Sequence, residues 1–413
     1  MTSVDQGLFK GVAVVIDDGI ETESEIQEIV AAIREGGGHA VTLPALPDED
    51  ADLENFANAA FFIMDWNLEP IPLGVKLPGS VADDQVQKNI QFLKRLGKHR
   101  HAPVFIFTNQ ETSEVIEALE EHEDLYSQPN SSHIMVKSKA DVGRRVYEVL
   151  NQWAGQAPSV LALKNWEQSY LRAINALFAD FHNRDQYWPV LLWQTYKADG
   201  APPAEELGRL ITRLVTSRMK PLDVNLTPFE DAVEAEHRSN AAGYKASLMQ
   251  VLEGERFVRD ERLDGSNVAP GDVFMSDDDG TKTYYLNIRA ECDCIVRNGK
   301  GNPNLYLLKG VVLLESDFEV HKDFGVREQD NQGIIFAMYE GQTFLFKFRE
   351  LTVAKWKTWK DKRMGRLLPP FSTRLLQRYA AYSHRAGLPR IPQALASLSD
   401  QQQTSETRSQ SPA

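Results

Sequence analysis

Residues 11–18 read GVAVVIDD, an apolar and β-branched run that ends in two aspartates. Similar runs follow in the first 150 residues: AAFFIM (59–64), PVFIF (103–107), HIMV (133–136) and the weaker HAVTL (39–43). Amphipathic stretches separate them, such as ETESEIQEIVAAIREGGG, whose acidic first turn suits the positive end of a helix dipole. Strands that alternate with helices indicate β-α-β units. We therefore predict a doubly wound, five-stranded parallel sheet of the flavodoxin-like kind over residues 1–153.

The remainder of the chain changes character twice. Apolar residues at helical spacing between Trp166 and Phe181 predict a helical segment over residues 160–262, whose aromatic face we expect to be core. Runs such as KTYYLNIRAECDCIV, separated by Asp, Gly and Asn turns, predict a small β-rich α+β domain over residues 263–395 with a C-terminal helix. Residues 396–413 are polar and are predicted to be disordered. The fold class is α/β.

Composition and charge restrict the kind of protein further. The chain has 413 residues and a formal net charge of −14, and residues 1–150 hold 26 acidic against 12 basic side chains, which accounts for the whole excess. An acidic first domain repels nucleic acid and anionic membranes and attracts divalent cations. There is no long apolar stretch or secretory signal, and only two cysteines occur. We therefore expect a cytoplasmic protein without a membrane partner.

Polar side chains follow the predicted strands at the points where the strands end. Asp17 and Asp18 follow the first strand, Asp65 the third, Thr108 the fourth and Lys137 the fifth. The carboxyl ends of parallel strands meet at one edge of the sheet, where open α/β sheets bind their ligands. Three carboxylates at one edge repel one another, and a hard cation such as Mg²⁺ relieves that repulsion. The pattern predicts a metal site.

A metal beside a carboxylate, a hydroxyl and a lysine suits the transfer of a phosphoryl group to an acidic nucleophile. Asp65 would attack phosphorus and form an aspartyl phosphate. The cation, Lys137 and Thr108 would then stabilise the phosphoryl oxygens. The alternative is structural, since aspartates after a strand also cap helices, a lysine often ends a strand in solvent and a threonine forms turns.

These segments resemble the receiver domain of two-component response regulators over roughly residues 8–153. VAVVIDD matches the acidic pair, FFIMDWNLEP the phospho-acceptor, VFIFTNQ the switch hydroxyl and HIMVKS the lysine. The resemblance implies that Asp65 is the phosphorylation site and that Asp18 binds Mg²⁺ directly. It also implies that Asp17 binds Mg²⁺ through water and that the backbone carbonyl of Asn67 completes the ligands. Asn109 follows Thr108 where the family often has a small residue, which predicts an altered phosphoryl lifetime. A degenerate receiver that is not phosphorylated is the alternative.

The C-terminal region also carries a resemblance. The segments GDVFMSDDDGTKTYYLNIRAECDCIV and LPPFSTRLLQRYAAYSHRAGLPRIP resemble bacterial receiver proteins with an uncharacterised C-terminal region. Such proteins include the stand-alone receiver component of Detocs-type antiphage phosphorelays. This resemblance implies a phosphate sink in antiviral defence.

Two motifs of the C-terminal region have competing interpretations. Cys292 and Cys294, with His321 far along the chain, lack the paired spacing of structural zinc sites, so we predict a buried strand there. The basic stretch KWKTWKDKRMGR (355–366) combines tryptophans with lysines, as nucleic-acid surfaces do. We favour an exposed helix whose tryptophans pack inward, because the region as a whole is neutral.

The sequence thus predicts a phosphoprotein that receives a phosphoryl group on Asp65 from a sensor histidine kinase and has no enzymatic activity of its own. Its other expected partner is a protein effector, and nucleic acid is not expected. The alternative is a phosphorylation-controlled effector whose C-terminal module binds nucleic acid or another macromolecule. A third interpretation makes that module an enzyme.

Overall fold

The computed structural model describes residues 7–48, 53–56, 58–68, 79–99, 102–122, 124–126, 133–182, 184–278, 280–297, 300–317, 320–321 and 325–386. Its chain divides into two compact units. The N-terminal unit comprises Met1–Gln186 and Gly208–Val233, and the C-terminal unit comprises Tyr187–Leu207 and Glu234–Ala413. The helical residues that follow the parallel sheet in the sequence are thus divided between the two units. The predicted tail at 396–413 lies outside the described residues.

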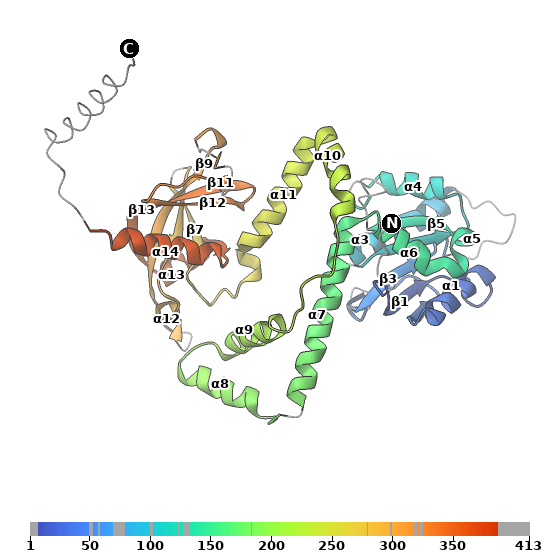
Figure 1. The fold of residues 1–413 in the computed structure, drawn as a ribbon, viewed down its shortest axis with the longest axis horizontal. Coiled ribbons are helices and arrows are strands. Elements are labelled where there is room, and N and C mark those ends of the chain that lie inside the picture. The colour runs from blue at the N-terminus through green and yellow to red at the C-terminus, as the bar shows by residue number, and fades with distance from the viewer. Residues whose placement is uncertain are drawn as a thin grey trace, which may run out of the picture. The chain divides into compact units, whose positions relative to one another are not determined.

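The N-terminal unit contains a five-stranded, all-parallel sheet in the order β2-β1-β3-β4-β5, which confirms the predicted flavodoxin-like topology (Figure 1). Its strands are β1 (Val12–Ile16), β2 (His39–Leu43), β3 (Ala59–Met64), β4 (Val104–Thr108) and β5 (Ile134–Ser138). Its helices are α1 (Ser24–Glu35), α3 (Gly79–His99), α4 (Thr112–Glu120), α5 (Lys139–Val142) and α6 (Val146–Ala154).

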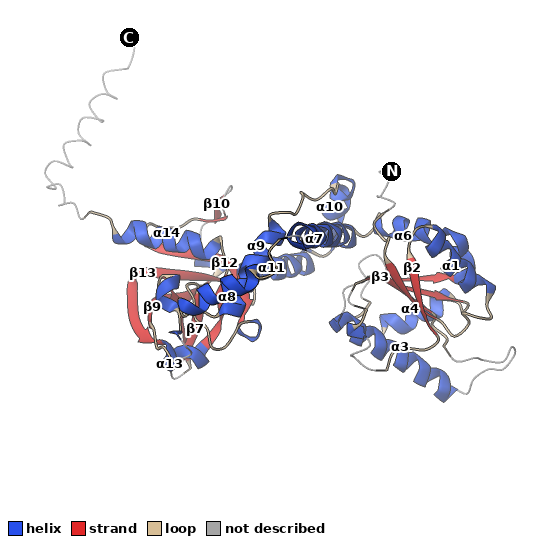
Figure 2. Ribbon diagram, turned by 90° about the horizontal axis from the view of Figure 1, so that it is seen from below, coloured by secondary structure: helices blue, strands red, loops and turns tan. Residues whose placement is uncertain are grey.

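Alternate residues of the central strands contribute to two separate cores, one on each face of the sheet. Helices cover both faces (Figure 2). On one face, Phe61 and Phe105 pack with the apolar stripe of α1 and with α6. On the other face, Phe62 and Ile106 pack with α3 and α4. Because both faces are covered, the central strands β1, β3 and β4 are almost entirely apolar, as is usual in parallel sheets.

The helical region follows α6. It consists of α7 (Pro158–His182), α8 (Trp188–Ala198), α9 (Pro203–Thr216), α10 (Glu230–Ser239) and α11 (Ala241–Arg256). The start of α7 belongs to the first core, where Val160 is buried and the Lys164 ammonium donates to the Ala60 carbonyl at 3.0 Å. The prediction that the aromatic face of α7 is core is wrong, because Trp166 and Phe178 are 46% and 71% exposed.

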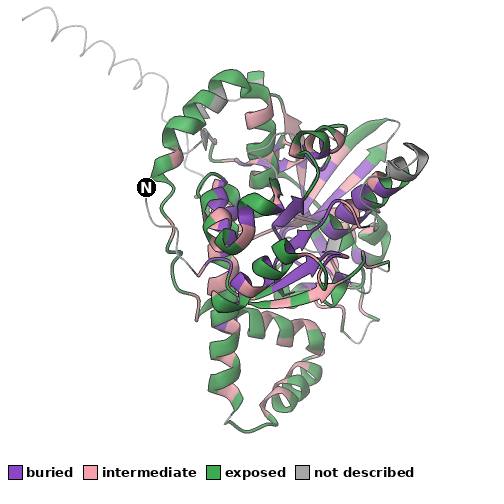
Figure 3. Ribbon diagram, turned by 90° about the vertical axis from the view of Figure 1, so that its right-hand side faces the viewer, coloured by how far each residue is buried: buried purple, intermediate pink, exposed green. Residues whose placement is uncertain are grey.

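The C-terminal unit is built on a seven-stranded antiparallel sheet in the order β12-β13-β9-β8-β7-β14-β6. Its strands are β6 (Phe257–Arg259), β7 (Asp272–Asp278), β8 (Thr281–Asn287), β9 (Asn304–Leu313), β12 (Gln332–Tyr339), β13 (Gln342–Lys355) and β14 (Arg363–Leu367), and a separate pair is β10 (Val320–His321) with β11 (Gly325–Val326). Its helices are α12 (Glu291–Cys294), α13 (Trp356–Trp359) and α14 (Phe371–Ser383). The predicted β-rich region with a closing helix is confirmed. In Figure 3 the buried residues concentrate on the strands.

Two local predictions have opposite outcomes. Residues 291–294 form the one-turn helix α12 instead of a strand, with Cys292 exposed and Cys294 buried. The buried thiol accepts from the Asn287 amide at 3.4 Å, and burial raises its pKa to about 11. The inward packing of the tryptophans is confirmed, because Trp356 is buried and Trp359 packs edge-on against Phe274.

Within the described part of the chain, no helix is both long and apolar enough to cross a bilayer.

Candidate phosphoryl-acceptor and metal site

An acidic cluster lies at the carboxyl edge of the parallel sheet. Asp17 directly follows β1, and its N–H donates to the Leu43 carbonyl of β2 at 2.9 Å. Asp65 directly follows β3, and its N–H donates to the Ile16 carbonyl of β1 at 2.9 Å. These main-chain bonds continue the sheet pairing by one residue. They fix both carboxylates at the same edge, as the sequence predicts.

Lys139 joins the carboxylates to one another. Its ammonium nitrogen Nζ lies 2.8 Å from Asp65 Oδ2, 2.9 Å from Asp17 Oδ2 and 2.8 Å from Glu23 Oε2. The Lys139 side chain is completely buried, and Asp17 and Asp65 are nearly so. One ammonium therefore faces three carboxylates, which leaves an excess of two negative charges when all three are ionised.

The predicted lysine is therefore corrected from Lys137 to Lys139. Lys137 is still part of β5, where it pairs in register with Phe107, and its side chain is exposed. The strand runs on to Ser138, and Lys139 is the first residue of α5. The sequence prediction took the end of the apolar run as the end of the strand. Lys139, two residues further on, lies beyond the end of the strand, and its side chain points towards the carboxylates.

Glu23 is the second site residue that the sequence prediction missed. It immediately precedes α1, and its carboxylate also accepts from the Asn109 amide at 3.3 Å. A side chain on Gly19 would place its Cβ 2.6 Å from the Glu23 side chain, so the glycine leaves the room that Glu23 occupies. Nothing in the residue pattern marked Glu23, because the path of the loop after β1 decides where it points.

The other predicted residues lie at the same edge without joining the cluster. Asp18 is half-buried and has no hydrogen bond or ion pair among the described residues. Thr108 ends β4, is fully buried, and its hydroxyl accepts from the Gln110 N–H at 3.1 Å. The Asn67 N–H donates to Asp65 Oδ1 at 3.3 Å. The roles of Asp18, Thr108 and Asn67 in ligand binding stay predictions.

Helix α3 holds the backbone that follows Asp65. The amide of the buried Asn89 donates to the Trp66 carbonyl at 2.6 Å, and Gln85 donates to the Asn89 side-chain oxygen at 3.2 Å. Asn89 is therefore oriented by a neighbour on its own helix. This two-step connection fixes the direction of the chain from Asp65 to Asn67.

Burial and charge shift the protonation equilibria of the cluster. Burial raises the pKa of Asp65 to about 6, although Lys139 acts in the opposite direction. Burial likewise raises the pKa of Asp17. Burial alone would lower the pKa of Lys139, but the carboxylates of Asp65, Glu23 and Asp17 outweigh it and raise that pKa. The lysine therefore stays charged, beside two aspartates whose ionised forms burial disfavours.

The donor set fits a metal ion. One carboxylate oxygen from each of Asp17, Glu23 and Asp65 lies within 4.8 Å of the others, and this is the one such group of three among the described residues. Asp17 Oδ2 is buried, and its contact among the described residues is the ion pair with Lys139 at 2.9 Å. Carboxylate oxygens are the ligands of hard divalent cations, so three of them within this distance make a suitable donor set.

A comparison of the chain with models of known protein families found no match, and a search of curated proteins found no significant match.

Proposed function

We propose that the N-terminal unit is a receiver-type domain that accepts a phosphoryl group on Asp65 from the phosphohistidine of a sensor kinase. One observation carries the proposal. Asp65 Oδ2 lies 2.8 Å from the buried Lys139 ammonium at the carboxyl edge of a 2-1-3-4-5 sheet, next to a second buried aspartate. A carboxylate held in this way can act as a nucleophile and is shielded from bulk water.

The step is an in-line displacement at phosphorus. A carboxylate oxygen of Asp65 forms the new O–P bond while the P–N bond to the kinase histidine breaks, and the histidine leaves as neutral imidazole after taking up a proton. With its pKa at about 6, Asp65 is mostly ionised at neutral pH and needs no base to activate it. The carboxylates of Asp17, Glu23 and Asp65 would hold Mg²⁺, which when bound would supply positive charge to the phosphoryl oxygens.

Lys139 and Thr108 have separate tasks in this proposal. The Lys139 ammonium pairs with Asp65 before transfer and with a phosphoryl oxygen afterwards, so the positive charge is already in place when charge develops. The Thr108 hydroxyl, at the end of the neighbouring strand β4, donates a hydrogen bond to the product. An effector would detect the changed position of these groups.

The test is to incubate the full chain with acetyl phosphate and Mg²⁺ and to follow its intact mass. We expect the mass of one phosphoryl group to be added to the parent and to be removed by hydroxylamine, which attacks acyl phosphates. Asp65→Asn should gain nothing. Asp48→Asn, at an exposed aspartate of the same unit, is the matched control and should be labelled like the parent. Labelling of Asp65→Asn would refute the proposal.

The role as a phosphate sink in antiphage defence is the finer part of the proposal and is supported by the sequence resemblance alone. It requires a kinase that also phosphorylates a second receiver. In a mixture of the three proteins, the parent chain should slow labelling of the second receiver, and Asp65→Asn should not. Equal rates in the two mixtures would exclude the sink.

A further inference from the structure

The C-terminal unit contains a cavity of about 700 Å³ that has no part in phosphoryl transfer. Its walls come from the turn before α9, the loop that precedes β7, the residues around α12 and the start of α13. The lining includes Lys197, Lys357 and Lys360, and among the described residues that line it there is no carboxylate. We call it the lysine cavity. Its volume lies in the range of sites for small organic ligands.

Two carboxylates close to the lining residues, those of Asp264 and Glu205, accept hydrogen bonds from neighbouring side chains. Asp264 Oδ1 accepts from the N–H of Ser266 at 2.8 Å and from its hydroxyl at 2.7 Å. The Asn267 amide donates to Asp264 Oδ2 at 3.2 Å and also to Glu205. The contacts of the lysines are longer, since Lys360 pairs with the exposed Asp361 at 3.9 Å and the Lys357 ammonium donates to the Lys300 carbonyl at 3.4 Å. Among the described residues that line the cavity, the charged side chains are all lysines.

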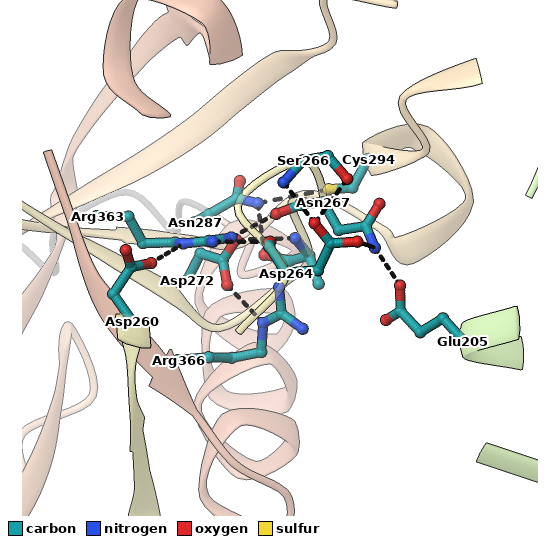
Figure 4. Close-up of polar contacts among 11 residues, drawn as sticks. Glu205, Asp260, Asp264, Ser266, Asn267, Asp272, Asn287, Cys294, Arg363 and Arg366 are labelled. Atoms are coloured by element: carbon teal, nitrogen blue, oxygen red, sulfur yellow. Dashed lines mark hydrogen bonds and ion pairs between the residues drawn. The ribbon is translucent and has the colours of Figure 1, made fainter. Parts of the chain in front are cut away.

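A buried ionic network fixes one wall of the lysine cavity (Figure 4). The guanidinium of Arg363 is 1% exposed and donates to the backbone carbonyls of Asp264, at 2.9 Å, and of Asn267. It also pairs with Asp260 and with the buried Asp272, which in turn pairs with Arg366. These hydrogen bonds from Arg363 therefore fix the position of the loop that carries Ser266 and Asn267. A wall fixed in this way loses little conformational entropy when a ligand binds.

Part of the lining is apolar. Ala201, Pro202, Pro203, Val296 and the buried Trp356 belong to it. Three lysines together with this apolar surface suit a molecule with an anionic end and a flat or apolar body. An anion without such a body would leave the apolar wall in water, and a neutral molecule would leave the lysines without a partner.

We propose that the lysine cavity binds a phosphorylated small molecule of about mononucleotide size. Its phosphate groups contact Lys357, Lys360 and Lys197, and its apolar body lies against Pro202, Pro203 and Val296. The volume of about 700 Å³ matches a small molecule rather than a nucleic-acid strand. This site is independent of Asp65, so the chain would respond to a small molecule as well as to phosphorylation.

The test uses ADP as the probe, with the full chain in EDTA so that no metal reaches the N-terminal unit. Isothermal titration should show saturable binding of one ADP per chain, at least tenfold tighter than inorganic phosphate or adenosine. The double variant Lys357→Ala/Lys360→Ala should weaken binding at least tenfold. Lys282→Ala removes one exposed positive charge on β8, outside the cavity, and should change the affinity less than twofold.

A second measurement uses the unaltered protein. Saturating ADP should protect Lys357 and Lys360, but not Lys282, from acetylation, as read by peptide mass spectrometry. The proposal is overturned if ADP does not saturate, if ADP protects neither cavity lysine, or if phosphate alone binds as tightly. It is also overturned if a single-stranded oligonucleotide binds at the same lysines more tightly than ADP, because the surface would then serve a polymer.

Discussion

Lys139 determines the charge balance of the acidic cluster, because its ammonium contacts all three carboxylates. Removing one partner of a buried ion pair leaves uncompensated charge, which costs about 3–5 kcal/mol. In Lys139→Met three carboxylates would remain without a cation. We expect an unfolding free energy lower by roughly this amount, as measured by urea denaturation, and at least tenfold slower labelling by acetyl phosphate.

Lys137→Met is the matched control for this prediction. Its side chain is exposed on β5, so we expect a stability change within about 0.5 kcal/mol and labelling at the parent rate. If Lys137→Met instead slowed labelling and lowered stability more than Lys139→Met, the functional lysine would be Lys137. Raising Mg²⁺ in the same assay should restore part of the stability of Lys139→Met, because the cation replaces the missing charge.

The raised pKa of Asp65 predicts a particular pH dependence of stability. The folded state holds the proton of Asp65 up to about pH 6, and the unfolded chain releases it near the ordinary value of 3.8. The parent therefore loses stability as pH rises between these two values, and the penalty remains in full above pH 6. Without divalent cations, Asp65→Asn should be more stable than the parent by roughly 1–3 kcal/mol at pH 7.5.

The difference between the two proteins should vanish below about pH 4, where Asp65 is protonated in both states. Urea denaturation at a series of pH values in EDTA measures it. A difference that is constant with pH would show that Asp65 keeps an ordinary pKa in the fold. Asp48→Asn, which changes an exposed carboxylate, should follow the parent at every pH.

Glu23 and Asp18 give different predictions for the metal. The structure places the Glu23 carboxylate in the cluster and leaves Asp18 outside it, whereas the sequence resemblance implies Asp18 as a direct ligand. We expect Glu23→Gln to weaken Mg²⁺ binding at least tenfold and Asp18→Asn to weaken it less than threefold, as measured by calorimetric titration. A larger loss in Asp18→Asn would assign the ligand to Asp18.

At the scale of single residues, the sequence predicted the part of the site that strand ends determine. Asp17, Asp65 and Thr108 each follow an apolar run directly, and the structure places each at the carboxyl edge. Lys139 and Glu23 stand beyond the strand ends, in a helix start and a loop end. Their directions depend on the three-dimensional path of those connections, which the periodicity of the sequence does not encode.

At the scale of elements, α7 is held to the parallel sheet by a buried polar contact. The Lys164 ammonium donates to Ala60 of β3 at 3.0 Å and pairs with Glu167 on its own helix. Replacing it with methionine keeps the apolar stem but leaves the Glu167 carboxylate without this cation. We expect Lys164→Met to lower the unfolding free energy of the N-terminal unit by about 1–3 kcal/mol.

Arg172→Met, at an exposed position of α7, is the control for this change and should stay within about 0.5 kcal/mol of the parent. Urea denaturation followed by far-ultraviolet circular dichroism measures both. Equal effects of the two substitutions would show that the first turns of α7 do not depend on the Lys164 contact for their attachment.

Element prediction succeeded where burial is two-sided. The run at 59–64 matches β3 residue for residue, because a strand covered on both faces is continuously apolar. The weaker run at 39–43 matches β2, which lies at the sheet edge and is partly exposed. Prediction failed for α7, whose apolar residues beyond its first turns are largely exposed. Helical spacing identifies a face, but it does not identify what covers that face. The strand predicted around Cys292 is wrong, because these residues form α12 in the connection between the paired strands β8 and β9.

At the scale of the whole molecule, the two units have separate hydrophobic cores, and no described residue belongs to a core of both. Units with their own cores unfold as separate cooperative transitions unless a large interface couples them. We expect two transitions in calorimetry of the full chain. Mg²⁺ should raise the transition of the N-terminal unit, and Asp65→Asn should abolish that shift.

ADP, by the proposal for the lysine cavity, should raise the other transition alone. A single transition that both ligands raise together would show that the units are coupled. A shift of the same transition by both ligands, with the other unchanged, would place both sites in one unit and contradict the cavity proposal.

The central claim is that Asp65 carries the phosphoryl group, and chemical mapping tests it most directly. Borohydride reduces an aspartyl phosphate to homoserine, which marks the modified position in the peptide sequence. After treatment of the full chain with acetyl phosphate and Mg²⁺, the account predicts homoserine at position 65 and at no other aspartate. Homoserine at a different aspartate, or unmodified Asp65 in protein whose fold is intact, would contradict it.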